Sequence, residues 1–327
     1  MLLFAFLITN AYSWWGHAHM VIAQIAESLL SKSEIQKIEK IISYGTLPYS
    51  TIVSCASWQD DVKSYGFSGM GNWHFIDTPL LLNVTDMSKI TIQPNTYNVT
   101  NYLVHAKECL DDKTTSDEWA LAFHIRSIIH FVGDVHTPHH SCQMYSDSLP
   151  TGDLGGNRYY LDCEYGSACN NIHFLWDSAG LYYPLLNPIS SINLNQFNQN
   201  ASKLMKEFPM SYFTSNGYDL KSYAPYVWAN ESFTYASKYG YNTPINRRPS
   251  DEYFTTVQQH SKERIALAGY RLGYLLQSLL SNENFNKIEL KPKVSTREIA
   301  IWVVNAFLFV GIVVVAFFNA KARRANQ

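Results

Sequence analysis

The stretch from Glu118 to Val132, EWALAFHIRSIIHFV, is the strongest constraint on how this chain folds. It is mostly apolar and contains neither Gly nor Pro, which predicts a buried helix. A second apolar stretch covers residues 252–280 and ends in AGYRLGYLLQSLL, and a capping box, Ser31-x-x-Glu34, begins a third with isoleucines on one face. Strand signals are few and short. We therefore expect a mainly α fold, with a single helical domain over residues 14–281.

The N-terminal residues predict a signal peptide. The apolar run MLLFAFLI is far too short to span a bilayer, and Ala11 and Ser13 follow it with the small-x-small spacing that signal peptidase accepts. We interpret residues 1–13 as this signal peptide, so that the mature chain begins at Trp14.

The C-terminal residues predict a membrane anchor. Residues 299–318 contain no charge, and twenty apolar residues cross about 30 Å of hydrocarbon as a helix. The positive residues Lys321, Arg323 and Arg324 follow the run, and such residues mark the cytoplasmic side. We expect a type I membrane protein, with a stalk over residues 282–298, one transmembrane helix over 299–318 and a cytoplasmic tail over 319–327.

Modification signals and charge agree with a domain that faces the cell surface or an endolysosomal lumen. Four N-glycosylation sequons begin at Asn83, Asn98, Asn200 and Asn230. The formal net charge is −2, and the cationic residues of the predicted tail leave the remainder more acidic. Because no basic field attracts polyanions, any chemistry on nucleic acid needs cations held at the site.

Five cysteines in an oxidising compartment predict disulfides with one thiol left over. Cys163 and Cys169 are close enough in sequence to close a small loop. The spacing leaves open the pairing among Cys55, Cys109 and Cys142. A zinc site built from cysteines is not expected, because the chain has no C-x-x-C pair.

Histidine and aspartate recur at the spacing of metal ligands. His130 and Asp134 are four apart in HFVGDVHTPHH, so they share one face if the helix over 118–132 continues. His173 and Asp177 in NIHFLWD have the same spacing, and the Gly-rich loop GDLGGN lies between the two pairs. A single histidine is usually a hydrogen-bonded core or surface residue. Two such pairs in one chain favour a zinc site with open positions for hydrolysis.

Together these motifs resemble those of the class I zinc-dependent nucleases, the single-strand-preferring nucleases and 3′-nucleotidases of fungi, plants and protozoa. The resemblance runs from Trp14 to the RLGYLL helix and includes SWQD at 57–60 and WHFID at 73–77. It implies the mainly α fold that these nucleases share with zinc-dependent phospholipase C.

The resemblance also implies three zinc ions per chain. The first would be held by Asp60, His74, His130 and Asp134. The second would be held by the amine and carbonyl oxygen of Trp14, by His19 and by Asp134, which bridges the first two ions. The third would be held by His140, His173 and Asp177.

Several neighbouring residues receive roles from the same resemblance. Chemistry alone does not choose among His136, His139 and His140, and His140 is taken because the family's ligand lies six residues after the bridging Asp. His136 is expected to support the ligands. Phe75 matches the position that stacks a base, and Lys63 matches a basic position near the phosphate. The tryptophans expected to pack in the core are Trp58, Trp73 and Trp176.

The implied activity is hydrolysis of single-stranded DNA and RNA to 5′-mononucleotides, and removal of phosphate from 3′-nucleotides. The ions would lower the pKa of a shared water toward neutrality and take the departing 3′ oxygen, and the expected catalytic residues are Asp134 and Lys63. No obligate protein partner is expected.

Two alternatives remain at this point. A zinc-dependent phospholipase C shares the fold and the N-terminal Trp, but its last ligand resembles Glu, whereas this chain has Asp177. A non-catalytic surface receptor stabilised by zinc is the other, and the complete ligand set argues against it.

Overall fold

The computed structural model describes residues 14–44, 49–93, 95–112, 117–164, 169–183, 194–281 and Phe285. The chain divides into two compact units, residues 1–288 and 289–327. The predicted signal peptide, membrane span and tail lie outside the described residues, as does the predicted stalk apart from Phe285. Within the described residues, no helix has the length and apolar character needed to cross a membrane.

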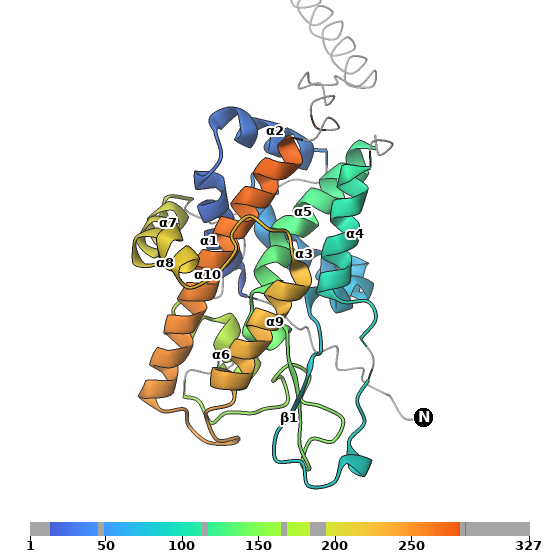
Figure 1. The fold of residues 1–327 in the computed structure, drawn as a ribbon, viewed down its shortest axis with the longest axis vertical. Coiled ribbons are helices and arrows are strands. Elements are labelled where there is room, and N and C mark those ends of the chain that lie inside the picture. Colours follow the sequence, from blue (N-terminus) through green and yellow to red (C-terminus); the bar gives the residue numbers. More distant parts are fainter. Residues whose placement is uncertain are drawn as a thin grey trace, which may run out of the picture. The chain divides into compact units, whose positions relative to one another are not determined.

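Helices dominate the described part of the first unit, which confirms the mainly α prediction (Figure 1). The α-helices are α1 (Gly16–Ser28), α2 (Lys32–Ile42), α3 (Trp58–Val62), α4 (Val99–Asp111), α5 (Glu118–Val135), α6 (Ile172–Asp177), α7 (Leu194–Glu207), α8 (Met210–Ser215), α9 (Pro225–Tyr235) and α10 (Asp251–Leu280). Shorter helical turns are η1 (Ser54–Ser57), η2 (Lys63–Phe67), η3 (Ser68–His74), η4 (Met87–Lys89), η5 (Pro138–His140) and η8 (Ala236–Gly240).

Local signals set the ends of these helices. The predicted capping box is present at the start of α2, where the Ser31 side chain accepts from the Glu34 amide and the Glu34 carboxylate accepts from the Ser31 amide. Asp117 caps α5 by accepting from the Ala120 amide, and Ser250 caps α10 in the same way. The α5 helix continues three residues beyond the predicted end, to Val135, so the condition for His130 and Asp134 to share a face is met.

The long helix α10 packs along α1, beside α5, in the middle of the domain (Figure 1). Two glycines of the AGYRLGYLL segment explain this close approach. A Cβ at Gly269 would lie 2.6 Å from the Ile25 side chain, and one at Gly273 would lie 3.2 Å from the Ala26 carbonyl oxygen. Because α1 also carries His19, this packing holds one edge of the histidine cluster.

A short parallel pair of strands joins two distant parts of the chain. The strand β1 (Pro79–Leu81) pairs with β2 (Gln143–Tyr145), with Pro79 opposite Gln143 and Leu81 opposite Tyr145. Just before the pair, the Ile76 amide donates to the His140 carbonyl oxygen at 2.7 Å. The pairing therefore brings residues 74–77 beside the PHH turn.

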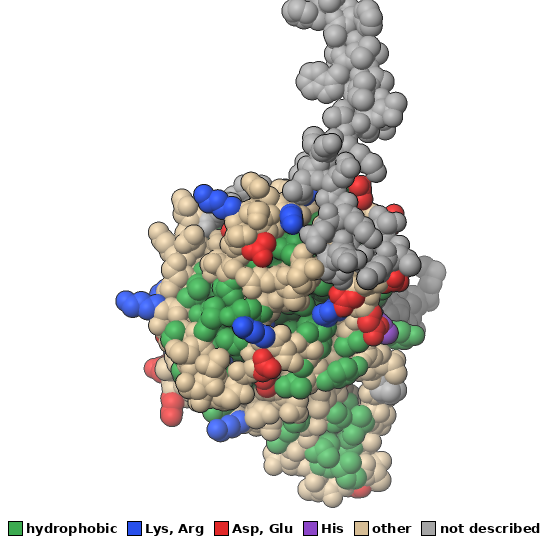
Figure 2. All heavy atoms as spheres, turned by 45° about the horizontal axis from the view of Figure 1, so that its top comes forward, with side chains coloured by type: hydrophobic (Ala, Val, Ile, Leu, Met, Phe, Trp, Pro, Cys, Tyr) green, Lys and Arg blue, Asp and Glu red, His purple; other side chains and the backbone are tan. Residues whose placement is uncertain are grey.

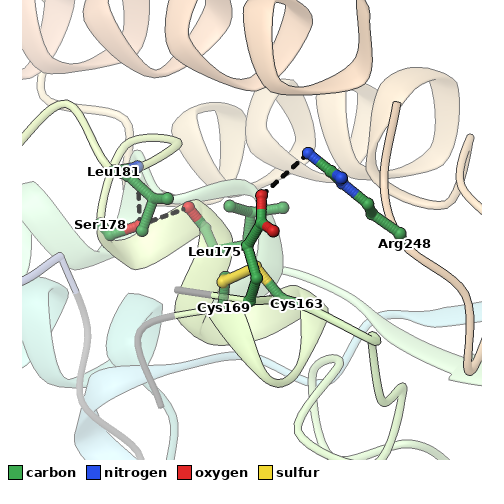
Figure 3. The surroundings of a disulfide bond; sticks show 7 residues. Cys163, Cys169, Leu175, Ser178, Leu181 and Arg248 are labelled. Atoms are coloured by element: carbon green, nitrogen blue, oxygen red, sulfur yellow. Dashed lines mark hydrogen bonds and ion pairs between the residues drawn. A yellow bond between two sulfur atoms is a disulfide. The ribbon is translucent and has the colours of Figure 1, made fainter. Parts of the chain in front are cut away.

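The predicted Cys163–Cys169 disulfide is present, with Cα atoms 5.7 Å apart (Figure 3). It closes the loop that leads into α6, and Arg248 pairs with Glu164 beside it at 2.9 Å. The expectation of a further disulfide is wrong, because Cys55, Cys109 and Cys142 are free. These three lie on separate elements: in η1, on α4 and just before β2.

Candidate metal centre

Three groups of histidine and aspartate side chains have their ligand atoms within 4.8 Å of one another in the described part of the chain, and all of these residues are buried. The groups are His19, Asp60 and His130; His74, His130 and Asp134; and His140, His173 and Asp177. All eight side chains that the sequence predicted as ligands fall within these groups.

The carboxylate of Asp134 lies at the centre of the first two groups. One turn before it on α5, His130 places Nε2 3.3 Å from Oδ2, and His74 at the end of η3 places Nδ1 2.9 Å from the same oxygen. From α1, His19 places Nε2 3.2 Å from the other oxygen, Oδ1. Three separate elements thus direct imidazole nitrogens at one carboxylate.

The glycine beside this carboxylate makes room for the α1 histidine. A Cβ at Gly133 would lie 2.6 Å from Nδ1 of His19. The His19 ring is fully buried and stacks on the His130 ring with centroids 3.9 Å apart, so a side chain at position 133 would displace it from this packed position.

The side chain of Asp60 completes the first cluster from α3. Its Oδ1 lies 3.6 Å from Nδ1 of His74 and 3.7 Å from Nε2 of His130. The ammonium of Lys63, one turn later, lies 2.7 Å from the same oxygen and is itself almost buried. A positive charge therefore lies at the edge of the cluster, and the role near the phosphate expected for Lys63 stays a prediction.

The third group joins the PHH turn to α6. Asp177 places Oδ2 3.2 Å from Nε2 of His173, one turn earlier on α6, and Oδ1 3.8 Å from Nε2 of His140. The two imidazole rings stack with centroids 5.0 Å apart. The sequence could not choose among the histidines of HTPHH from chemistry alone, and the structure brings His140 into this group.

Backbone carbonyl groups orient three of the histidines. Nδ1 of His130 lies 2.6 Å from the Ala56 oxygen, Nδ1 of His140 2.8 Å from the His74 oxygen and Nδ1 of His173 2.7 Å from the Gly155 oxygen. Donation from Nδ1 fixes the tautomer and leaves the Nε2 lone pair facing the carboxylates. This is the arrangement of histidines that ligate a metal.

The pKa shifts in the cluster differ in direction: although burial opposes it, the charges of Asp134 and Asp60 raise the pKa of His130, whereas the pKa values of His19 and His74 fall. Burial and the charge of His130 lower the pKa of His19 to about 4, and burial and Lys63 lower the pKa of His74 to about 3. Although burial opposes ionisation, Lys63 and His130 hold the pKa of Asp60 below its usual range. Neutral imidazole and carboxylate are the forms that bind zinc.

The buried carboxylates also show that the site fits a cation. The oxygens of Asp134 and Asp177 face imidazole nitrogens at 2.9–3.8 Å, and none of them makes a hydrogen bond of regular geometry in the described part of the chain. Burial raises the pKa of Asp177 well above its usual value. A buried carboxylate that lacks a well-formed hydrogen bond is costly, and a bound dication would offset that cost. The donor set, imidazole and carboxylate without thiolate, suits zinc in a hydrolytic site.

The start of the described chain lies against the third group. The indole of Trp14 is fully buried, and the Trp15 amide donates to the Asp177 carbonyl oxygen at 3.0 Å. His19 follows on the first turns of α1. The predicted first residue of the mature protein is therefore inside the domain, next to a residue whose amide contacts the end of α6.

The other residues named from the sequence have various environments. Phe75, directly after His74, is half-buried. Trp176 is fully buried and donates to the Tyr253 hydroxyl at 3.1 Å, whereas Trp58 and Trp73 are only partly buried. Trp73 stacks on Tyr102. All three tryptophans pack against other side chains, but only Trp176 is the buried core residue that the sequence predicted.

The two remaining histidines of HTPHH lie outside the three groups. His139 packs against the rings of Trp176 and Tyr241. His136 places Nδ1 2.7 Å from the Val132 oxygen, and its Nε2 accepts from Nη1 of Arg271 at 2.9 Å. The structure thus holds His136 in a network behind the ligands.

Sequence reasoning missed the charged residues of that network and one buried acid. Arg264 donates to the His136 carbonyl oxygen at 3.2 Å, and both Arg264 and Arg271 pair with Glu231. Asp153 of the Gly-rich loop accepts from the Met144 amide at 2.9 Å and from the Tyr241 hydroxyl at 2.8 Å. Two arginines inside an otherwise apolar helical stretch were the available signal for the network.

The surface shows no dense basic region on the face drawn in Figure 2. Basic and acidic side chains are scattered there among apolar and neutral ones. That face offers no extended field for a polyanion, which leaves the buried ligand groups as the place where cations would be concentrated.

Comparison with known proteins identifies the family. A model of the S1/P1 nuclease family matches residues 14–281. Endonuclease 4 of Arabidopsis thaliana is 24% identical over 299 residues, which cover 85% of this chain and 92% of the relative. Nuclease S1 of Aspergillus oryzae (strain ATCC 42149 / RIB 40) is 25% identical over 311 residues, which cover 83% of this chain and 93% of the relative.

The matched segment contains every residue of the three ligand groups, and the relatives it resembles are named as nucleases and endonucleases. The chain therefore belongs to the S1/P1 nuclease family, whose members are zinc-dependent hydrolases of nucleic acids.

Proposed function

We propose that this protein is a membrane-anchored nuclease and 3′-nucleotidase that uses three zinc ions. The observation that carries the proposal is the buried carboxylate of Asp134, which faces imidazoles from three different elements at 2.9–3.3 Å. The proposed ligands are Trp14, His19, Asp60, His74, His130, Asp134, His140, His173 and Asp177.

The chain's own residues provide orientation around these ions. Asp134 and the histidines that it faces hold the two nearer groups in one geometry, while carbonyl groups fix the imidazole tautomers. Zinc, when bound, supplies a water nucleophile at neutral pH and offsets the charge that develops on the leaving oxygen. Lys63 lies where its ammonium can contact the phosphate that enters beside Asp60.

We assign the preference for single-stranded substrates to Phe75, the residue directly after His74. Phe75 is half-buried, so the residue is still partly accessible to a base that stacks on it. A base stacks on such a ring only after it leaves its own stack, which favours single strands over duplexes. The proposed products are 5′-mononucleotides from DNA and RNA, and a nucleoside with inorganic phosphate from 3′-nucleotides.

The proposed location rests on the sequence of the two chain ends. A signal peptide over residues 1–13 and a span over 299–318 would make a type I protein with the nuclease domain outside the cytoplasm. In sealed microsomes, the domain should resist added protease while the tail is cleaved. A domain that is digested in sealed vesicles would reverse this orientation.

The activity is tested with a set of substrates at equal concentration. Purified protein should release mononucleotides from single-stranded DNA and RNA faster than from the matched duplex, and phosphate from 3′-AMP but not from 5′-AMP. Phosphatidylcholine should not be hydrolysed. Faster hydrolysis of the phospholipid would assign the phospholipase C activity instead, and activity on none of these substrates after zinc loading would favour a receptor.

A further inference from the structure

The fold divides the four N-glycosylation sequons into two that can carry a glycan in the folded protein and two that cannot. We propose that the folded protein is glycosylated at Asn83 and Asn230 and not at Asn98 or Asn200. The inference rests on the secretory location proposed above.

Both polar atoms of the Asn98 side chain make hydrogen bonds inside the fold. The side chain is buried, and it caps α4 by accepting from the Asn101 amide at 3.0 Å and from the Thr100 hydroxyl at 2.7 Å. Its Nδ2, the atom that a glycan would occupy, donates to the Asn95 carbonyl oxygen at 2.9 Å. A sugar at this nitrogen would have to fit into the interior where the Asn98 side chain is buried, which leaves no path for it to solvent without opening the fold.

The side chain of Asn200 points toward the buried histidine of α1. Asn200 lies in α7, and its Nδ2 is 2.9 Å from Nε2 of His17. The His17 ring is 1% exposed and stacks on Tyr183 with centroids 4.7 Å apart, so it cannot move aside. The next residue, Ala201, is also buried. A glycan at Asn200 would separate α7 from α1.

Asn83 differs from Asn98 and Asn200 in that it is exposed to solvent. It lies in the loop after β1, and its backbone has φ 54, a conformation that Asn adopts more readily than most residues. The Thr85 amide and hydroxyl both contact the carboxylate of Asp147, so the sequon is anchored through its threonine. Within the described residues, no hydrogen bond of the Asn83 side chain is recorded.

The side chain of Asn230 is exposed on α9, although its two successors point inward. Glu231 pairs with the buried arginines, and the hydroxyl of Ser232 donates to the Val135 carbonyl oxygen at 2.6 Å. An enzyme that reads the Ser232 hydroxyl reaches it only before α9 packs onto α5. We therefore place transfer at this site before folding, and the finished helix then leaves the glycan in solvent.

The transfer itself needs a polyprenyl-diphosphate-linked oligosaccharide as donor, supplied in the lumen of the secretory pathway. The side-chain nitrogen forms a bond to the anomeric carbon of the sugar, the bond from that carbon to the diphosphate oxygen breaks, and the nitrogen loses one proton. The polyprenyl diphosphate leaves. Transfer can also take place at Asn98 or Asn200 on the unfolded chain, but that product cannot form the contacts described above and is lost from the folded fraction.

The experiment maps glycans on the folded protein. The full chain is expressed in a eukaryotic cell with a cleavable signal peptide of known function in place of residues 1–13, which delivers the domain to the lumen whether or not its own leader does. The monodisperse fraction is treated with peptide N-glycosidase in heavy-oxygen water, and each sequon peptide is measured by mass spectrometry. Labelled aspartate is expected at positions 83 and 230 only.

Matched variants check the assignment on gels without disturbing the fold. N83D keeps a residue that tolerates positive φ, and N230Q keeps a good helix former; each should lose one glycan step in mobility, and the double variant two. N98D retains the helix cap, and S202A removes the third sequon at an exposed position without touching Asn200. Neither should change mobility.

Either of two results would overturn the proposal: a glycan on Asn98 or Asn200 in the folded fraction, or no glycan on Asn83 and Asn230. An incorrect secretory location would give a different glycosylation result. In that case the natural leader yields unglycosylated chain while the substituted leader yields the two-glycan form.

Discussion

Arg271 holds Glu231 through two ion-paired contacts, Nη1 to Oε2 at 2.6 Å and Nη2 to Oε1 at 2.7 Å. The first of these nitrogens also lies 2.9 Å from Nε2 of His136, two residues beyond Asp134. A second buried arginine, Arg264, reaches the same carboxylate at 3.1 Å and the His136 carbonyl oxygen at 3.2 Å. Through these contacts α9 and α10 fix the end of α5, and with it the position of the central carboxylate.

Removing the charge of Glu231 should therefore destabilise the domain strongly. E231Q leaves two buried guanidinium groups without their anion, which costs about 3–5 kcal/mol for a broken buried pair. The matched control is E164Q, because Glu164 and Arg248 form an exposed pair, worth at most about 1 kcal/mol. Urea unfolding of both variants measures the difference, and losses of equal size would show that the network does not stabilise the fold.

The second prediction concerns Asp134, whose carboxylate lies at the centre of the first two ligand groups. D134N should bind less zinc than the wild type and lose more than about 100-fold in activity, the upper range for changes to residues that only support a ligand. The control is D147N, which changes an exposed aspartate after β2 in the same way. Elemental analysis and nuclease assays report the two effects. Wild-type zinc content in D134N would remove it from the ligand set.

Much of the helical architecture was predictable because its signals are local. The capping box of α2, the extent of α10 and the i,i+4 pairs on α5 and α6 all depend on residues within a few positions of one another. The small Cys163–Cys169 loop belongs to the same class.

Features made by residues far apart in sequence were not predictable in this way. The parallel pairing of β1 with β2 joins two segments of three residues, too short to show a strand pattern. The Glu231 network joins charges on different helices, for which a single sequence has no periodic signal. The free state of three cysteines depends on where their elements pack, and counting cysteines suggested a bridge that the fold does not form.

The third prediction concerns Gly133, the residue before Asp134, where a change to Ala adds one methyl group. In G133A the new Cβ would lie 2.6 Å from Nδ1 and 2.7 Å from Cε1 of His19, so the ring must shift away from Asp134. We expect lower zinc content and activity, although Ala is the better helix former. G69A is the control, because a Cβ there meets nothing within 4 Å. Unchanged zinc content in G133A would show that His19 is not tied to that position.

The buried acid of the Gly-rich loop gives a pH-dependent prediction. Burial raises the pKa of Asp153 to about 6, well above its usual value, so the folded state favours the protonated form. The unfolded chain releases that proton near pH 4, and the free energy of unfolding therefore falls as pH rises from about 4 to about 6. Burial also raises the pKa of Asp77 to about 6, and this effect has the same sign.

D153N removes the Asp153 contribution. Relative to the wild type, the variant should gain about 3 kcal/mol of stability between pH 4 and pH 7, from a shift of about two pKa units. Chelator is present throughout, so that metal release at low pH does not contribute. A difference between the two proteins that stays constant over this range would show that Asp153 is ionised in the fold at all these pH values.

The last prediction concerns the first residue of the proposed mature chain. Trp14 is fully buried, and the Trp15 amide donates to the Asp177 carbonyl oxygen, so the proposed first residue lies inside the domain. If the α-amine of Trp14 ligates zinc, any residue retained before it turns that amine into an amide, which has no lone pair to donate at neutral pH. Protein that keeps Ser13 should then contain less zinc and lose most of its activity, although every side-chain ligand is intact. The control is the same protein after a protease removes the extension directly before Trp14, which should restore both readouts, and Edman sequencing should find Trp first in the active form. Full zinc content with the extension in place would show that the amine is not a ligand, and the second ion would then have to be held by His19 and Asp134 without it.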